Sequence, residues 1–97
     1  MSAIDSYKLK ISQLRILVAV AEYHNFSEAA LYLNISQSAV SHAIATLEAQ
    51  LRIDLFHRKR NGADLTHVGE QLVSPAKEIL NQLQKMATLI PYSKSLE

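Results

Sequence analysis

The sequence predicts a mainly helical domain in which three short helices form the core, a β-hairpin follows them and a long helix comes last. Two observations support this fold class. Apolar residues recur at helical spacing in four segments, and an Asn-Gly pair, a strong hairpin signal, separates two short apolar runs near residue 60. With 97 residues, 48% of them hydrophobic, the chain can form one small core with an appended element rather than two full cores.

Two short helices are predicted first, after a loose N-terminal arm over residues 1–8. Ser12 is expected to cap a helix that ends near residue 23 or 24. Ser27 is expected to cap a second helix over residues 28–33. Asn34 then marks a turn, because asparagine tolerates the left-handed conformation.

The third predicted helix, over residues 36–51, carries the first indication of function. Its apolar stripe consists of Val40, Ile44, Leu47 and Leu51. The side chains away from this stripe are short, polar and almost uncharged at the N-terminal end, which suits close approach to base edges in a major groove. The candidate DNA-contacting residues of this helix are Ser36, which also caps it, Gln37, Ser38, Ser41 and His42. Gln37 could pair bidentately with adenine, although many solvated helices also have small polar faces.

A β-hairpin is predicted over residues 55–65, with Asn61 and Gly62 as the two central residues of a type I′ turn. Residues 52–60 carry four of the ten Lys and Arg residues of the chain and only one of its nine Asp and Glu residues. A hairpin beside a helix-turn-helix is a wing, and its basic residues Arg58, Lys59 and Arg60 could contact a phosphate backbone. The alternative is a solvated basic turn.

The last predicted helix spans residues 67–90, with Thr66 as its cap. Apolar residues follow a 3.5-residue spacing that is typical of a coiled-coil contact. The expected dimerisation residues are Leu72, Ala76, Ile79, Leu80, Leu83, Met86 and Ile90. The alternative is that this face packs against the first helix of the same chain.

Several classes of site find no support in the sequence. The chain has no cysteine, its two glycines form no phosphate-binding loop, and its four histidines lack metal-ligand spacing. No serine lies in a convincing nucleophile setting. We therefore expect no enzymatic activity, no metal and no cofactor. Because no signal peptide or membrane-length apolar run is present, we expect a cytoplasmic, nucleoid-associated protein without membrane contact.

A spaced pattern over roughly residues 9–90 resembles the N-terminal domain of LysR-type transcriptional regulators. The matching residues are Phe26-Ser27-Glu28-Ala29-Ala30, Leu33, Ser36-Gln37-Ser38-Ala39-Val40-Ser41, Ile44, Leu47-Glu48, Leu51, Leu55-Phe56, Arg58, Leu65-Thr66 and Gly69. Arg52 departs from the pattern, since the family usually has glycine there. A left-handed cap at a non-glycine residue costs about 1 kcal/mol.

The resemblance implies a winged helix-turn-helix over residues 9–66, with the helix-turn-helix at about 26–45, followed by a linker and dimerisation helix over 67–90. It also implies a homodimer, with antiparallel linker helices, that reads an interrupted inverted repeat in double-stranded DNA. Residues 91–97 would lead toward a missing C-terminal domain, the only part expected to bind a small-molecule effector. For the full-length protein it allows a tetramer and contact with RNA polymerase.

The sequence thus favours a sequence-specific DNA-binding domain of a LysR-type regulator. The alternative is a helical dimerisation or adaptor module that binds protein without reading DNA. The basic hairpin distinguishes the two, because an adaptor does not need it.

Overall fold

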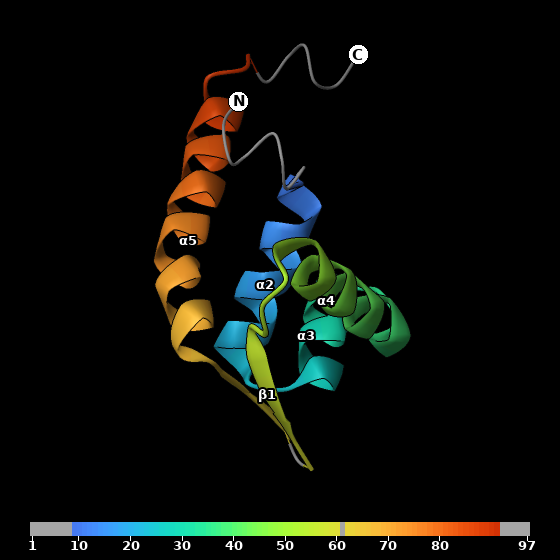
Figure 1. The fold of residues 1–97 in the computed structure, drawn as a ribbon. Coiled ribbons are helices and arrows are strands. Elements are labelled where there is room, and N and C mark those ends of the chain that lie inside the picture. Colours follow the sequence, from blue (N-terminus) through green and yellow to red (C-terminus); the bar gives the residue numbers. More distant parts are fainter. Residues whose placement is uncertain (1–8, 61, 92–97) are drawn as a thin grey trace.

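The computed structural model describes residues 9–60 and 62–91, so the expected arm over 1–8, the turn residue Asn61 and most of the expected tail over 91–97 lie outside the described residues. Its elements, in chain order, are α2 (Ile11–Tyr23), α3 (Phe26–Leu33), α4 (Gln37–Leu51), β1 (Phe56–Lys59), β2 (Gly62–Leu65) and α5 (His67–Thr88) (Figure 1). The mainly helical fold with a hairpin between the third helix and the long last helix is confirmed.

The core is built around α2, which lies between α5 on one side and the α3–α4 pair on the other (Figure 1). The large side chains that are almost completely buried are Leu17, Val20, Val40, Ile44, Leu47 and Leu55. Three of these come from the predicted apolar stripe of α4. Because each fully buried aliphatic side chain contributes roughly 1.5–3 kcal/mol, this small set accounts for much of the stability of the fold.

The helix caps are partly those predicted. Ser36 Oγ accepts a hydrogen bond from Ala39 N at 3.0 Å, and Thr66 Oγ1 accepts one from Gly69 N at 3.1 Å, so both predicted caps are confirmed. The prediction for Ser12 is wrong, because α2 begins one residue before it.

At the start of α2, Lys10 N donates to Gln13 Oε1 at 2.9 Å, which closes the first turn without any hydroxyl. The prediction for Ser27 is also wrong. Asn25 caps α3 by accepting from Glu28 N at 2.9 Å, and asparagine is as good a cap as serine. Ser27 therefore lies inside the first turn of α3, with its hydroxyl free of any capping role.

The hairpin is antiparallel, with Phe56 opposite Leu65 and Lys59 opposite Gly62. This register pairs Gly62 with Lys59 inside the strands, so the prediction of Gly62 as a central turn residue is wrong, while Asn61 lies outside the described residues. Gly62 lies in β2 and does not have a positive φ. Its physical role is close approach, because a Cβ atom there would lie 2.5 Å from the carbonyl oxygen of His24. That carbonyl accepts a hydrogen bond from Ala63 N at 2.9 Å, which fixes the hairpin to the end of α2.

We expect Gly62→Ala to lower the free energy of unfolding by about 1–3 kcal/mol, because the added methyl group meets backbone rather than a side chain that can move. Chemical denaturation measures this. His57→Ala, at an exposed position of β1, is the matched control and should stay within about 0.5 kcal/mol of the wild type. A Gly62→Ala variant as stable as this control would contradict the close approach.

Left-handed residues end all three helices of the core. His24, Asn34 and Arg52 have φ values of 54°, 59° and 59°. The prediction for Asn34 is confirmed, and Arg52 adopts the left-handed conformation at the position where the LysR-type pattern has glycine. The hydrogen bond from Ile53 N to the Glu48 carbonyl at 3.2 Å closes the end of α4, so the arginine is accommodated without loss of the helix terminus.

Candidate nucleic-acid interface

The turn between α3 and α4 fixes the orientation of α4, the helix with the polar face expected to enter a groove. It consists of residues 34–36, and its geometry is fixed by hydrogen bonds from Asn34 N to Leu31 O at 3.2 Å and from Ile35 N to Ala30 O at 3.1 Å. Ala29 and Ala30 are buried, and their small size allows α3 to pack closely within the core. Two helices joined by so short a turn form a helix-turn-helix.

The predicted residues of α4 lie at its N-terminal end as expected. Gln37, Ser38 and His42 are exposed, and Ser41 is half-buried. The Ser36 hydroxyl is already engaged in hydrogen bonds within the chain, because it caps α4 and lies 3.2 Å from Ser38 Oγ. The polar face available to a partner therefore begins at Gln37.

A cleft of about 430 Å³ separates this face of α4 from the hairpin. Its lining comes from α3, α4 and both strands: Asn25, Phe26, Ser27, Gln37, Ser41, Arg58, Lys59, Arg60, Gly62 and Ala63. The structure thus brings two of the predicted residues of α4 together with all three predicted basic residues of the hairpin. Ser38 and His42 do not line this cleft.

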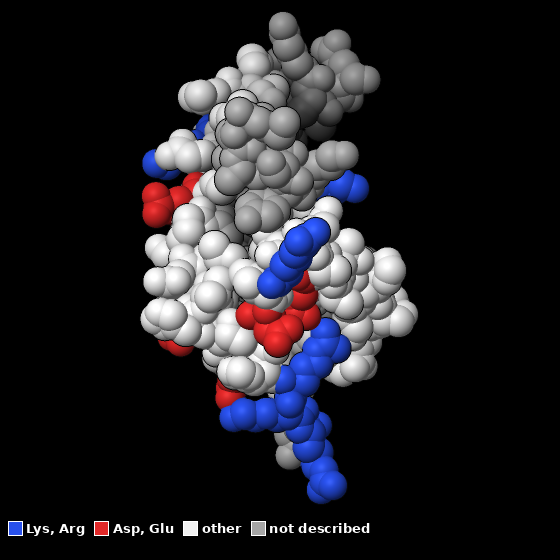
Figure 2. Space-filling view, viewed as in Figure 1, with Lys and Arg blue, Asp and Glu red and all other residues white. Residues whose placement is uncertain are grey.

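Positive charge is concentrated on the hairpin. Figure 2 shows Lys and Arg side chains that continue along the hairpin to its tip. Lys59 forms an ion pair with Asp64 across the two strands, and the Lys59 ammonium holds the pKa of the Asp64 carboxyl below its usual value. Among the described residues, Arg60 has no ion-pair partner, so its charge is fully available at the tip.

Arg58 occupies the junction between the hairpin and the helices. Its guanidinium carbon lies 4.7 Å from the centroid of the Phe26 ring, within cation–π range. The Phe26 ring meets Phe56 edge-on at 6.1 Å. One guanidinium nitrogen lies 3.9 Å from Glu48 Oε1. Because its side chain remains 49% exposed, Arg58 can contact a phosphate while these neighbours hold its orientation.

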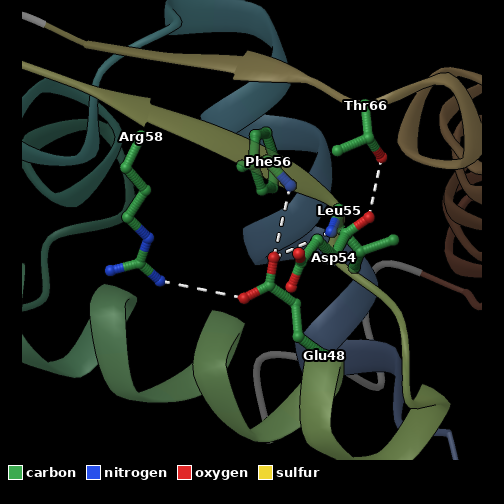
Figure 3. Close-up of polar contacts among 6 residues, drawn as sticks. All are labelled: Glu48, Asp54, Leu55, Phe56, Arg58 and Thr66. Atoms are coloured by element: carbon green, nitrogen blue, oxygen red, sulfur yellow. Dashed lines mark hydrogen bonds and ion pairs between the residues drawn. The ribbon is translucent and has the colours of Figure 1, made fainter.

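Glu48 ties α4 to the hairpin, as Figure 3 shows. Its Oε2 accepts hydrogen bonds from Leu55 N at 2.7 Å and from Phe56 N at 3.2 Å, at the start of β1. Nearby, Thr66 Oγ1 donates to the Asp54 carbonyl at 2.7 Å and connects the far end of the hairpin to the same loop. The sequence analysis did not predict that Glu48 would hold the hairpin against α4. The available signal was a lone acidic residue in an otherwise uncharged helix.

The predicted dimerisation face of α5 divides into two parts. Ala76 is buried and Leu72 half-buried in the core of this chain, so the N-terminal half of the face follows the intramolecular alternative. Leu80 lines a groove against α2. Further along, Ile79, Met86 and Ile90 are 44%, 63% and 60% exposed, and Leu83 is half-buried. The helix itself ends at Thr88, two residues before the predicted end.

No group of three His, Cys, Asp or Glu side chains in residues 9–60 and 62–91 is placed to hold a metal ion. Within the same ranges, no helix combines the length and the apolarity needed to cross a membrane.

Known proteins with similar sequences are transcriptional regulators by name. Residues 11–70 match the family model for bacterial regulatory helix-turn-helix proteins of the lysR family. The chain is 45% identical over 89 residues to the probable HTH-type transcriptional regulator LrrA of Synechococcus elongatus, covering 92% of this chain and 30% of LrrA. It is 39% identical over 90 residues to the uncharacterized HTH-type transcriptional regulator YvbU of Bacillus subtilis, covering 92% of this chain and 31% of YvbU.

Solved structures with the same fold include complexes with DNA. The CbnR_DBD-DNA complex superposes with a TM-score of 0.77 at 31% identity, covering 82% of this chain and 92% of that one. The BenM_DBD/catB site 1 DNA complex superposes with a TM-score of 0.79 at 31% identity, covering 84% of this chain and 91% of that one. The chain therefore spans about a third of the length of the two curated relatives and matches nearly all of these two DNA-binding domains. It belongs to the lysR family of bacterial regulatory helix-turn-helix proteins, and its fold is that of their DNA-binding domains.

Proposed function

We propose that this chain binds promoter DNA sequence-specifically and that a homodimer reads the two halves of an interrupted inverted repeat. The observation that carries the proposal is that Gln37 and Ser41 of α4 line the same cleft as the basic residues 58–60 of the hairpin. A major groove about 12 Å wide admits one α-helix, and a wing beside that helix meets the adjacent phosphates. The chain's membership of the lysR family supports the same function.

In this arrangement the two elements have different tasks. Gln37, Ser38, Ser41 and His42 supply short donors and acceptors to base edges, while Ser36 holds the end of the helix. Arg58, Lys59 and Arg60 contact phosphates, which fixes the position of the domain on the duplex without reading its sequence. Of the three, Arg60 is expected to contribute most, because Lys59 and Arg58 also face acidic side chains of the chain itself.

The dimer would form through the exposed apolar residues of α5. One recognition helix covers too few base pairs to single out a promoter, whereas two helices related by a twofold axis can read repeated half-sites in successive major grooves. A small-molecule effector, contact with RNA polymerase and a tetramer are proposed for the full-length protein on the family resemblance alone. We further propose a cytoplasmic, nucleoid-associated location and no enzymatic activity.

A binding titration tests the proposal against the adaptor alternative. The chain is titrated with a palindromic promoter fragment and with random duplex DNA, each at two salt concentrations. Specific binding should exceed non-specific binding by about 10³-fold or more at physiological salt. Absence of DNA binding at low salt would favour the adaptor module.

Neutralising the hairpin should weaken binding to every sequence equally. Arg60→Ala is expected to reduce the slope of log K against log salt by about 0.9, the value for one lost phosphate contact, with base preference unchanged. Lys77→Ala is the matched control, because Lys77 lies on α5 in an ion pair with Glu22 at 2.7 Å. An unchanged slope in Arg60→Ala would mean that the hairpin tip points away from DNA.

A further inference from the structure

The side chain of Gln37 is held by a residue of the preceding helix. Ser27 Oγ donates a hydrogen bond to Gln37 Oε1 at 2.8 Å, between the first turn of α3 and the first residue of α4. Both residues line the cleft between α4 and the hairpin. Since Asn25 caps the N-terminus of α3, the Ser27 hydroxyl is not required as a cap and is available for this contact.

This hydrogen bond leaves the two ends of the Gln37 amide unequal. Its oxygen is engaged by Ser27, and among the described residues no hydrogen bond holds its nitrogen. Nε2 carries two N–H donors, so the available end of the side chain is a donor. The bidentate pairing with adenine considered for Gln37 needs both ends of the amide to face one base, with the oxygen accepting from N6 and the nitrogen donating to N7.

We infer that Ser27 is a specificity-determining positioning residue, which fixes the Gln37 amide so that Nε2 reads a hydrogen-bond acceptor on one base pair. The acceptors that the major groove offers are O4 of thymine, O6 and N7 of guanine, and N7 of adenine, which lies beside the N6 amino donor. With the amide oxygen held by Ser27, that N6 donor stays unpaired, so thymine and guanine are the better partners. The inference rests on the proposed function, because it assigns a base preference to the DNA-facing end of α4. Without the Ser27 hydroxyl the amide can rotate until both of its ends face one base, and bidentate pairing with adenine N6 and N7 becomes available.

Selection of binding sites from a random duplex library tests this, with the wild-type chain, Gln37→Ala, Ser27→Ala and Ser27→Thr. The wild type should select thymine or guanine at one position of each half-site. Gln37→Ala should lose that preference by roughly 5- to 150-fold, the range for one good base contact. Ser27→Ala should lower the preference over adenine by about 2- to 12-fold, the worth of one hydrogen bond. Ser27→Thr keeps the hydroxyl and should restore the wild-type base.

Two further measurements separate positioning from other roles. The affinity of Ser27→Ala for random DNA and its unfolding midpoint should equal those of the wild type, since Ser27 is exposed and caps no helix. Replacing the selected base by 7-deazaguanine, or by a thymine analogue lacking O4, identifies the acceptor.

Three results would overturn the inference. One is selection of adenine by the wild type at the position that depends on Gln37. Another is an unchanged preference in Ser27→Ala, and the third is an equal loss of affinity for all DNA in that variant, which indicates a phosphate contact. If the wild type selects no sequence at all, the proposed function itself fails, and the inference fails with it.

Discussion

Ile79→Asp with Leu83→Asp is expected to give a folded monomer that binds an inverted repeat about 10²–10⁴-fold more weakly than the wild type, because the second half-site no longer binds as part of one molecule. Both residues lie on α5 after the buried Ala76. Ile79 is 44% exposed at the edge of an apolar pocket that Leu14 and Leu47 also line, and Leu83 is half-buried. A carboxylate on this face would have to be desolvated in a dimer, whereas in a monomer it stays in water. Sedimentation velocity measures the oligomeric state, and titration with half-site and full-site DNA measures the coupling.

The matched control is Asn81→Asp with Gln84→Asp. It adds the same charge to the same helix on the side away from Ile79 and Leu83, where both residues are exposed. This control should remain a dimer with full-site affinity. A wild-type chain that sediments as a monomer at tens of micromolar and still binds DNA specifically would refute the dimer, and so would a dimeric Ile79→Asp/Leu83→Asp variant.

Glu48→Ala should lower the free energy of unfolding by about 2–4 kcal/mol, because two backbone N–H groups at the start of β1 lose their acceptor, each at roughly 1–3 kcal/mol. The side chain of Glu48 is only 15% exposed, so water replaces it poorly. Glu48→Gln keeps one acceptor oxygen, so its free energy of unfolding should lie between those of the wild type and Glu48→Ala. Denaturant titration gives the stability, and hydrogen exchange should show lost protection at the Leu55 and Phe56 amides.

Glu22→Ala provides the comparison for Glu48. Glu22 also forms an ion pair, with Lys77, but its side chain is 51% exposed, and exposed pairs contribute about 0–1 kcal/mol. A Glu48→Ala variant no less stable than Glu22→Ala, with Leu55 and Phe56 still protected, would show that the hairpin holds its position without the carboxylate.

The features that the sequence predicted correctly depend on local spacing. The stripe of Val40, Ile44 and Leu47 follows from the helical period, and the caps at Ser36 and Thr66 follow from a hydroxyl just before a periodic run. The cap at Ser27 was wrong because Asn25, two residues earlier, is an equally good cap and competes for the same helix end.

The features that the sequence did not predict depend on contacts between distant segments. Gly62 is required by the carbonyl of His24, which the turn pattern around residue 60 does not contain. The partners of Glu48 are backbone groups that the fold, not the helical period, brings to it. The period of α5 likewise marks an apolar face without saying which neighbour covers it, so Leu72 and Ala76 were assigned to a dimer although Ala76 is buried in the chain's own core.

The attachment of the hairpin to α4 through Glu48 has a consequence for DNA whose sequence the domain never touches. Because this carboxylate fixes the start of β1 against α4, it also sets the distance between the side chains of α4 that we propose to read bases and the hairpin tip that we propose to bind phosphates, before any DNA is bound. A duplex whose groove width matches that distance binds without deformation, and any other duplex must bend or change its width at a cost that depends on its stacking. On the proposed function, we therefore expect the domain to distinguish duplexes by groove width, so that its selectivity extends to base pairs that lie between its contacts.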